Sequence, residues 1–114
     1  MSSSNGRNNA TKLREVVSAD NGDASVTITW DVDKEIQVWA TPLTADRTVT
    51  LSTTNAINGS RFRIIRKLAA TGVFNLNVGT GPLIQLSVGN EFCDVTYDGS
   101  AWFVSAYGTI YVAI

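Results

Sequence analysis

The feature that most restricts the fold of this chain is a period-two alternation of apolar and polar residues, repeated in short runs from Ser25 onwards. In the run SVTITW, Val26, Ile28 and Trp30 are large and apolar, and the two residues between them are threonines. Such alternation is typical of β-strands with one buried face. Roughly eight runs, spaced by about 8–12 residues with turn formers between them, predict an all-β fold: an antiparallel β-sandwich, a jelly roll or a small barrel.

The amino-terminal part of the chain has a different composition. It is rich in Ser and Asn, and its first residues, MSSSNGRNNA, lack the apolar region of a signal peptide. We therefore expect a flexible arm and loop over residues 1–24 and one β domain over residues 25–114. A chain of 114 residues, 44% of them hydrophobic, holds one small core, and such domains often gain stability by forming oligomers.

The charge balance and the hydropathy pattern argue against two classes of partner. Lys plus Arg is 9 and Asp plus Glu is 10, which gives a net charge of −1. Proteins that neutralise many phosphates are usually clearly basic. No apolar run approaches the ~20 residues that a membrane helix needs. We therefore expect no nucleic-acid partner and no membrane partner.

The residue types also bear on catalysis. The chain contains no histidine, which removes the commonest general base and the commonest transition-metal ligand. The single cysteine, Cys93, has no histidine to activate it, so a small core residue is the favoured interpretation. One cysteine allows no internal disulfide, which fits assembly in a reducing cytoplasm. We expect no enzymatic activity and no cofactor, although an active site shared between the chains of a trimer stays open.

Two groups of acidic residues offer alternatives. The loop SADNGDAS, followed by Asp31 and Asp33, supplies oxygen ligands for calcium, but it lacks the spacing of an EF-hand loop. Glu91, Asp94 and Asp98 could supply a carboxylate pair of the kind that glycosidases use. On one strand, however, Asp94 and Asp98 would be ~13 Å apart, which is long even for an inverting glycosidase. We favour a solvated loop for the first group and turn formation for Asp98.

The stretch VTYDGSAWFVSAYG predicts a β-hairpin. Asp98 and Gly99 form the tight turn, and Tyr97 and Trp102 pair across the two strands. The chain then continues into IYVAI, which is apolar to its last residue. We expect this segment to be buried, either by completing the sheet or in a neighbouring subunit.

Trp39 falls out of phase with Ile36 and Val38 on its predicted strand. Exposed there, it would be an interface anchor or a platform on which carbohydrate stacks; the alternative is a tryptophan covered by the loop at Pro42.

Arg61, Arg63 and Lys67 occupy odd positions of the next predicted strand, so a regular strand places them on one face and Arg66 on the other. That face is either solvated or in contact with an acidic partner surface.

Three pieces of sequence between Arg47 and Gly108 are distinctive in combination: the NGSRFRI strand, the ATGVFNLNVGTGPL segment, and the YDGSAW hairpin that runs into AYG. Together they resemble a module of tailed-bacteriophage virion proteins, carried by tail-fibre ends and by small virion structural proteins. The resemblance implies a β-structured, trimeric virion component without enzymatic activity.

The short polar arm and the apolar C-terminus lead us to expect a head decoration or cement protein. As a homotrimer it would bind the major capsid protein on the virion, after assembly in the host bacterial cytoplasm. The alternative is a tail-fibre or receptor-binding tip module, bound to tail proteins, that recognises a host surface glycan. The residues expected at subunit or capsid contacts are Arg7, Lys12 and Arg14 in the arm, and Trp39, Tyr111, Val112 and Ile114 in the β domain.

Overall fold

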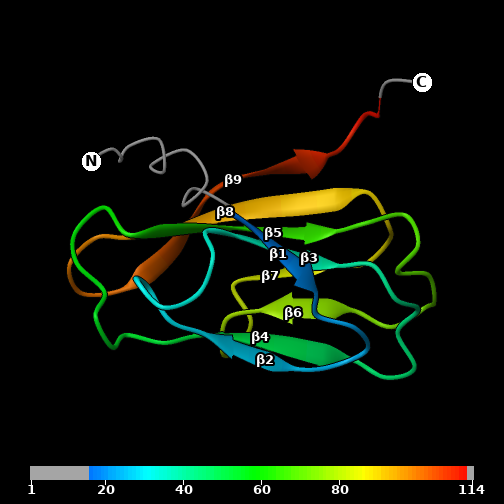
Figure 1. Cartoon of the computed structure of the whole chain (residues 1–114), viewed down its shortest axis with the longest axis horizontal. Coiled ribbons are helices and arrows are strands. Elements are labelled where there is room, and N and C mark those ends of the chain that lie inside the picture. Colours follow the sequence, from blue (N-terminus) through cyan, green and yellow to red (C-terminus); the bar gives the residue numbers. More distant parts are fainter. Residues whose placement is uncertain (1–15, 113–114) are drawn as a thin grey trace, which may run out of the picture.

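The structure of the chain is a computed structural model that describes residues 16–112. This part of the chain forms nine strands and no helix, which confirms the all-β prediction. The strands build two sheets with the hydrophobic core between them (Figure 1). Their bounds are β1 (Val17–Asp20), β2 (Val26–Ile28), β3 (Ile36–Trp39), β4 (Arg47–Leu51), β5 (Arg61–Arg66), β6 (Leu76–Val78), β7 (Ile84–Leu86), β8 (Glu91–Tyr97) and β9 (Trp102–Thr109).

From β1 to β6 the chain alternates between the two sheets. The five-stranded sheet has the order β1-β3-β5-β8-β9 and the four-stranded sheet the order β2-β4-β6-β7. Each strand from β3 to β6 therefore lies parallel to the strand two places before it. The pairs β5–β8, β6–β7 and β8–β9 are antiparallel. Both sheets are mixed, so the prediction of an antiparallel fold is wrong for the first six strands.

The reason for this error is that a turn signal marks where a strand ends, not which sheet receives the next one. Asn58 and Gly59 form a tight-turn pair, and Gly59 has the positive φ of 96° that such a turn favours. The turn lies in the connection from β4 to β5, which crosses from the four-stranded to the five-stranded sheet.

The first strand lies inside the segment that the sequence assigns to the arm and loop. β1 (Val17–Asp20) pairs with β3 at the edge of the five-stranded sheet. The Asp20 carboxylate holds the end of this strand, because it accepts hydrogen bonds from the amides of Gly22 and Ala40 and from the Thr41 hydroxyl. Ordered sheet structure thus begins before Ser25.

Trp39, expected as a surface anchor, is part of the core. Its side chain is 0% exposed, and its indole Nε1 donates a hydrogen bond to the carbonyl of Ala24 at 3.0 Å. The sequence places Trp39 correctly on the side opposite Ile36 and Val38, but that side faces the second sheet. Both faces of β3 are covered, so parity alone does not identify the inner one. The core cluster consists of Ile28, Trp39, Leu43, Val49, Phe62, Ile64, Leu76, Val78, Leu86, Cys93 and Val95.

The hairpin β8–β9 forms as predicted. The Tyr97 and Trp102 rings pair across it with centroids 5.2 Å apart. The Asp98 carboxylate accepts hydrogen bonds from the amides of Ser100 and Ala101, both at 2.8 Å, and Gly99 has a φ of 98°. Asp98 therefore acts as a turn former, as expected from its place before a glycine.

Arg66 is the last residue of β5 and points into the core, where its side chain is 0% exposed. Its guanidinium donates hydrogen bonds to the carbonyls of Ala70, Gly72 and Phe74 in the connection to β6. It also bonds the carbonyl of Leu86 on β7 at 2.7 Å. One side chain thereby ties the β5–β6 connection and the four-stranded sheet to the five-stranded sheet.

Carboxylates in the loops make the fold sensitive to acid. The Arg47 guanidinium, with help from Thr44, holds the pKa of Asp23 far below its usual range. Hydrogen bonds from Thr41 to Asp20 and from backbone amides to Asp98 lower the pKa values of these two groups as well. A carboxyl whose pKa is lower in the folded state stabilises the fold above its unfolded pKa and loses this contribution as the pH falls through the folded value.

We therefore expect the free energy of unfolding to be steady near neutral pH and to fall below about pH 4. Urea unfolding at a series of pH values from neutral to acidic measures this. The matched variant Asp23→Asn should be less stable at neutral pH and should lose less stability on acidification. An unchanged acid slope in Asp23→Asn would contradict the role given to this carboxylate.

Candidate functional site

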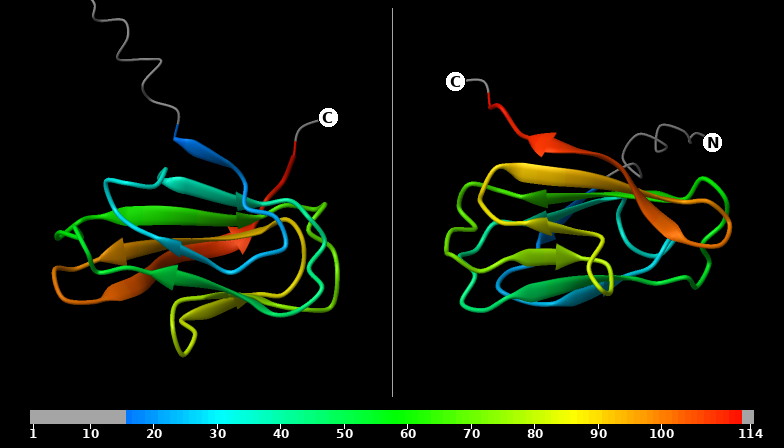
Figure 2. Two further views of the ribbon diagram at one scale, coloured as in Figure 1. Left: turned by 60° about the horizontal axis from the view of Figure 1, so that its bottom comes forward. Right: turned by 180° about the vertical axis from the view of Figure 1, so that it is seen from behind.

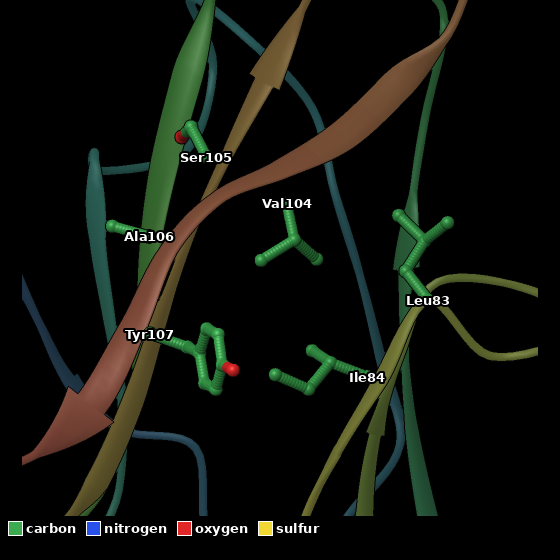
Figure 3. A pocket seen from close by; sticks show the side chains of 6 residues that line it. All are labelled: Leu83, Ile84, Val104, Ser105, Ala106 and Tyr107. Atoms are coloured by element: carbon green, nitrogen blue, oxygen red, sulfur yellow. The ribbon is translucent and has the colours of Figure 1, made fainter.

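The main candidate site on the described surface is a groove between β7 and β9, which we call the β7–β9 groove. It has a volume of about 680 Å³. Figure 3 shows Ile84 and Tyr107 pointing toward one another across it, with Val104 above the gap between them in this view. The lining residues are Leu83, Ile84, Val104, Ser105, Ala106 and Tyr107.

A β-bulge in β9 gives the groove its aromatic wall. Asp94 pairs with Ala106 but Val95 pairs with Val104, so Ser105 is an extra residue. The Ser105 hydroxyl turns to the outer face, where it lies 2.9 Å from the Thr96 hydroxyl. In a regular strand, positions 104 and 107 would lie on opposite faces. The bulge puts both on the inner face, an outcome that strict alternation in the sequence does not predict.

The groove is open because β9 lies at one edge of the five-stranded sheet and the short β7 at the edge of the four-stranded sheet. Figure 2 (right) shows β9 in red along the margin of the molecule. Tyr107 is 71% exposed although its side chain faces inward. Neither 83–88 nor 101–112 contains a charged residue. Exposed edge strands are usually protected by charges or prolines, so this uncharged aromatic edge is a candidate interaction surface.

The segment after β9 is a second exposed apolar feature. β9 ends at Thr109, and the amide of Ile110 then bonds the carbonyl of Asn90 at 2.7 Å. Tyr111 and Val112 follow with 91% and 70% of their surface exposed, and Figure 1 shows this stretch leaving the body of the two sheets. Tyr111 and Val112 therefore neither pair in the sheet nor pack in the core.

Of the residues expected at contacts, Tyr111 and Val112 lie on the surface and Trp39 does not. The remaining expected contact residues, Arg7, Lys12, Arg14 and Ile114, lie outside the described residues. Sequence reasoning missed Tyr107, Ile84 and Leu83; the available signal was the absence of charge in both edge strands together with their aromatic and aliphatic content.

The outer face of the five-stranded sheet is polar by contrast. Arg63 and Asp94 form a two-point ion pair at 2.7 and 2.9 Å, and the Arg63 guanidinium lies 4.9 Å from the centre of the Phe92 ring. Arg61 bonds Glu35 at 3.2 Å. Asp94 and the hydrogen bond it accepts raise the pKa of Arg63. These cations have partners within the chain, so an acidic partner would have to compete with Glu35 and Asp94.

The other residues considered for catalysis or metal binding have structural roles in the fold. Cys93 is fully buried, and burial raises the pKa of its thiol to about 12, which opposes a nucleophilic role. The loop considered for calcium directs its Asp20 and Asp23 carboxylates at Thr41, Thr44 and Arg47. Residues 16–112 contain no cluster of three or more His, Cys, Asp or Glu side chains arranged to hold a metal ion.

Within the same described range, there is no helix with the length and apolarity to cross a membrane. No family model, curated protein or solved structure matches this chain.

Proposed function

We propose that this protein is a structural component of a bacteriophage virion, which decorates the head and stabilises it by contacts across capsid subunits. The observation that supports this most is the contiguous uncharged surface formed by β9 and the β7–β9 groove, together with the exposed Tyr111 and Val112. A surface of this kind suits permanent association with another protein, because burying it removes no charged group from water. The sequence resemblance of Arg47 to Gly108 to virion modules supports the same proposal.

The proposed assembly is a homotrimer of two-sheet sandwich domains on the capsid surface, formed in the host cytoplasm. Each bound trimer adds binding free energy that must be lost before the shell opens. A lasting contact of this type buries at least ~1,000 Å² in total. Arg7, Lys12 and Arg14 would reach across to neighbouring capsid subunits, and no nucleic acid, membrane or cofactor takes part.

The test of this proposal is the copy number in purified virions, measured by quantitative mass spectrometry against the major capsid protein. A ratio within a few-fold of the capsid protein is the expected result. A handful of copies per particle would place the chain on the tail and would overturn head decoration.

Deletion of residues 1–13 is expected to lower capsid occupancy while leaving the β domain folded, because β1 begins only at Val17. Occupancy is measured by mixing the deletion variant with undecorated heads and sedimenting the particles. Circular dichroism of the free variant serves as the control for folding. Full occupancy by the shortened chain would show that the arm does not clamp the capsid.

The alternative function is a tail-fibre or tip module that recognises a host surface glycan. Exposed Phe103 and the polar hollow of about 340 Å³ on the outer face, lined in part by Glu35, Arg61, Arg63 and Asp94, favour it. Sugars stack on aromatic faces and hydrogen-bond to charged side chains beside them. A glycan array followed by titration should then detect weak binding that Phe103→Ala abolishes.

A further inference from the structure

We infer that the β7–β9 groove is the acceptor for the C-terminal apolar segment Ile110–Val112 of a second copy of this chain. This contact would hold the copies of the proposed homo-oligomer together, and formation of that oligomer is the only part of the proposed function on which it rests. It assigns the donor and the acceptor of the contact between copies.

The groove has the size and chemistry for such a segment. Its volume of about 680 Å³ lies within the ~300–1,000 Å³ range of ligand-binding clefts and cavities, and its open side leaves room for an extended segment to lie along it. Ile84, Val104 and Tyr107 offer aliphatic and aromatic surface, and the donor offers the same kind of side chains. Both sides are uncharged, so neither like-charge repulsion nor desolvation of an ion opposes their contact.

The backbone at the groove also favours an extended partner. β7 pairs only with β6, and β9 pairs only with β8, so each strand presents one edge without a neighbouring strand in the described chain. An extended peptide adds to such an edge by main-chain hydrogen bonds, while alternate side chains enter the pocket. Ile, Tyr and Val are among the residues most enriched in strands.

The donor segment does not reach the groove of its own chain. The hydrogen bond from Ile110 to Asn90 directs it toward a separate hollow of about 360 Å³, to which Leu68 and Val112 contribute. Each chain therefore carries one donor and one acceptor at different places. Contacts of this head-to-tail type close into rings when the rotation between copies permits, which is compatible with a trimer.

The test uses the full chain in solution, without capsids, and measures molecular mass by light scattering and sedimentation velocity. The wild type is expected to be an oligomer. The donor variant Tyr111→Ser/Val112→Ser and the acceptor variant Tyr107→Glu should each be monomers. An equal mixture of the two should contain a species with the mass of two chains, because the donor variant keeps an intact groove and the acceptor variant keeps an intact segment.

Phe103→Glu is the matched control, since Phe103 lies on β9 but faces the outer side, and its mass should equal that of the wild type. All substituted side chains are at least 44% exposed, and circular dichroism checks that each variant is folded. A monomeric wild type would overturn the inference. So would a donor variant that stays oligomeric, or variants whose mixture stays monomeric. An oligomer that fails to bind heads would refute head decoration alone, and a monomer that binds heads would refute the inference alone.

Discussion

Replacing Arg66 by methionine is expected to lower the free energy of unfolding by about 3 kcal/mol or more, the scale observed when one partner of a buried charged hydrogen-bond network is removed. Methionine fills much of the same volume, so the effect comes from lost hydrogen bonds and not from a cavity. The guanidinium is fully buried and bonds four backbone carbonyls at 2.7–3.2 Å. Without it, all four carbonyls would lose the guanidinium donor, and those of Ala70 and Leu86 would lose it in a buried environment.

The loop around Arg66 is constrained at one point, Gly72. Gly72, whose carbonyl Arg66 bonds, has a φ of 115°, and a Cβ at this position would lie 2.8 Å from the carbonyl oxygen of Leu43. The connection from β5 to β6 is therefore held close to the Leu43 segment at Gly72, which limits how far this part of the loop can move when the guanidinium is lost. Burial lowers the pKa of Arg66, and the charge of Glu91 opposes this shift. The hydrogen bonds to Arg66 itself come from backbone oxygens.

Urea unfolding followed by tryptophan fluorescence measures the effect, and a loss of 3 kcal/mol would lower the melting temperature by roughly 12–24 °C in a domain of this size. Arg66→Lys should also be destabilised, because one ammonium group does not replace the planar fork of a guanidinium. Arg61→Met, an exposed change on the same strand, is the control and should stay within about 0.5 kcal/mol of the wild type. Equal losses in Arg66→Met and Arg61→Met would contradict the central role of Arg66.

The sequence predicts local features of this fold well, because they depend on short-range rules. The turn at Asp98 and Gly99 is formed by residues that are neighbours in the sequence, and Tyr97 and Trp102 meet across it. Parity on β5 also holds: Arg61 and Arg63 lie on the outer face, opposite Arg66. The order of strands does not follow from such rules, since alternation is the same for a parallel and an antiparallel neighbour.

The candidate site depends on the features that alternation does not encode. The bulge at Ser105 turns Tyr107 to the same side as Val104, and only the pairing of β9 with β8 reveals it. The groove itself exists because β7 and β9 are edges of two different sheets, which is a property of the topology. The uncharged composition of both strands was visible in the sequence, but its location at an edge was not.

Trp39→Ala is expected to lower the free energy of unfolding by about 3–5 kcal/mol, the range for removing a large buried aromatic side chain. Trp39 is the largest fully buried side chain of the described core, and its loss would also leave the Ala24 carbonyl without the indole donor. Trp39→Phe keeps most of the volume and should cost clearly less.

The same variant separates a core residue from an interface residue. Where Trp39→Ala is still folded, its oligomeric mass should equal that of the wild type, because the side chain has no exposed surface to offer a partner. Tyr111→Ala is expected to behave in the opposite way. Because Tyr111 is 91% exposed, its substitution should change the free energy of unfolding of the monomer by no more than about 0.5 kcal/mol and should weaken association instead. If Trp39→Ala has normal stability but no longer associates, Trp39 is an interface residue, as its position in the sequence first suggested, and its assignment to the core is wrong. The opposite result would show that an aromatic residue out of phase on a strand marks the inner face when both faces of that strand are covered.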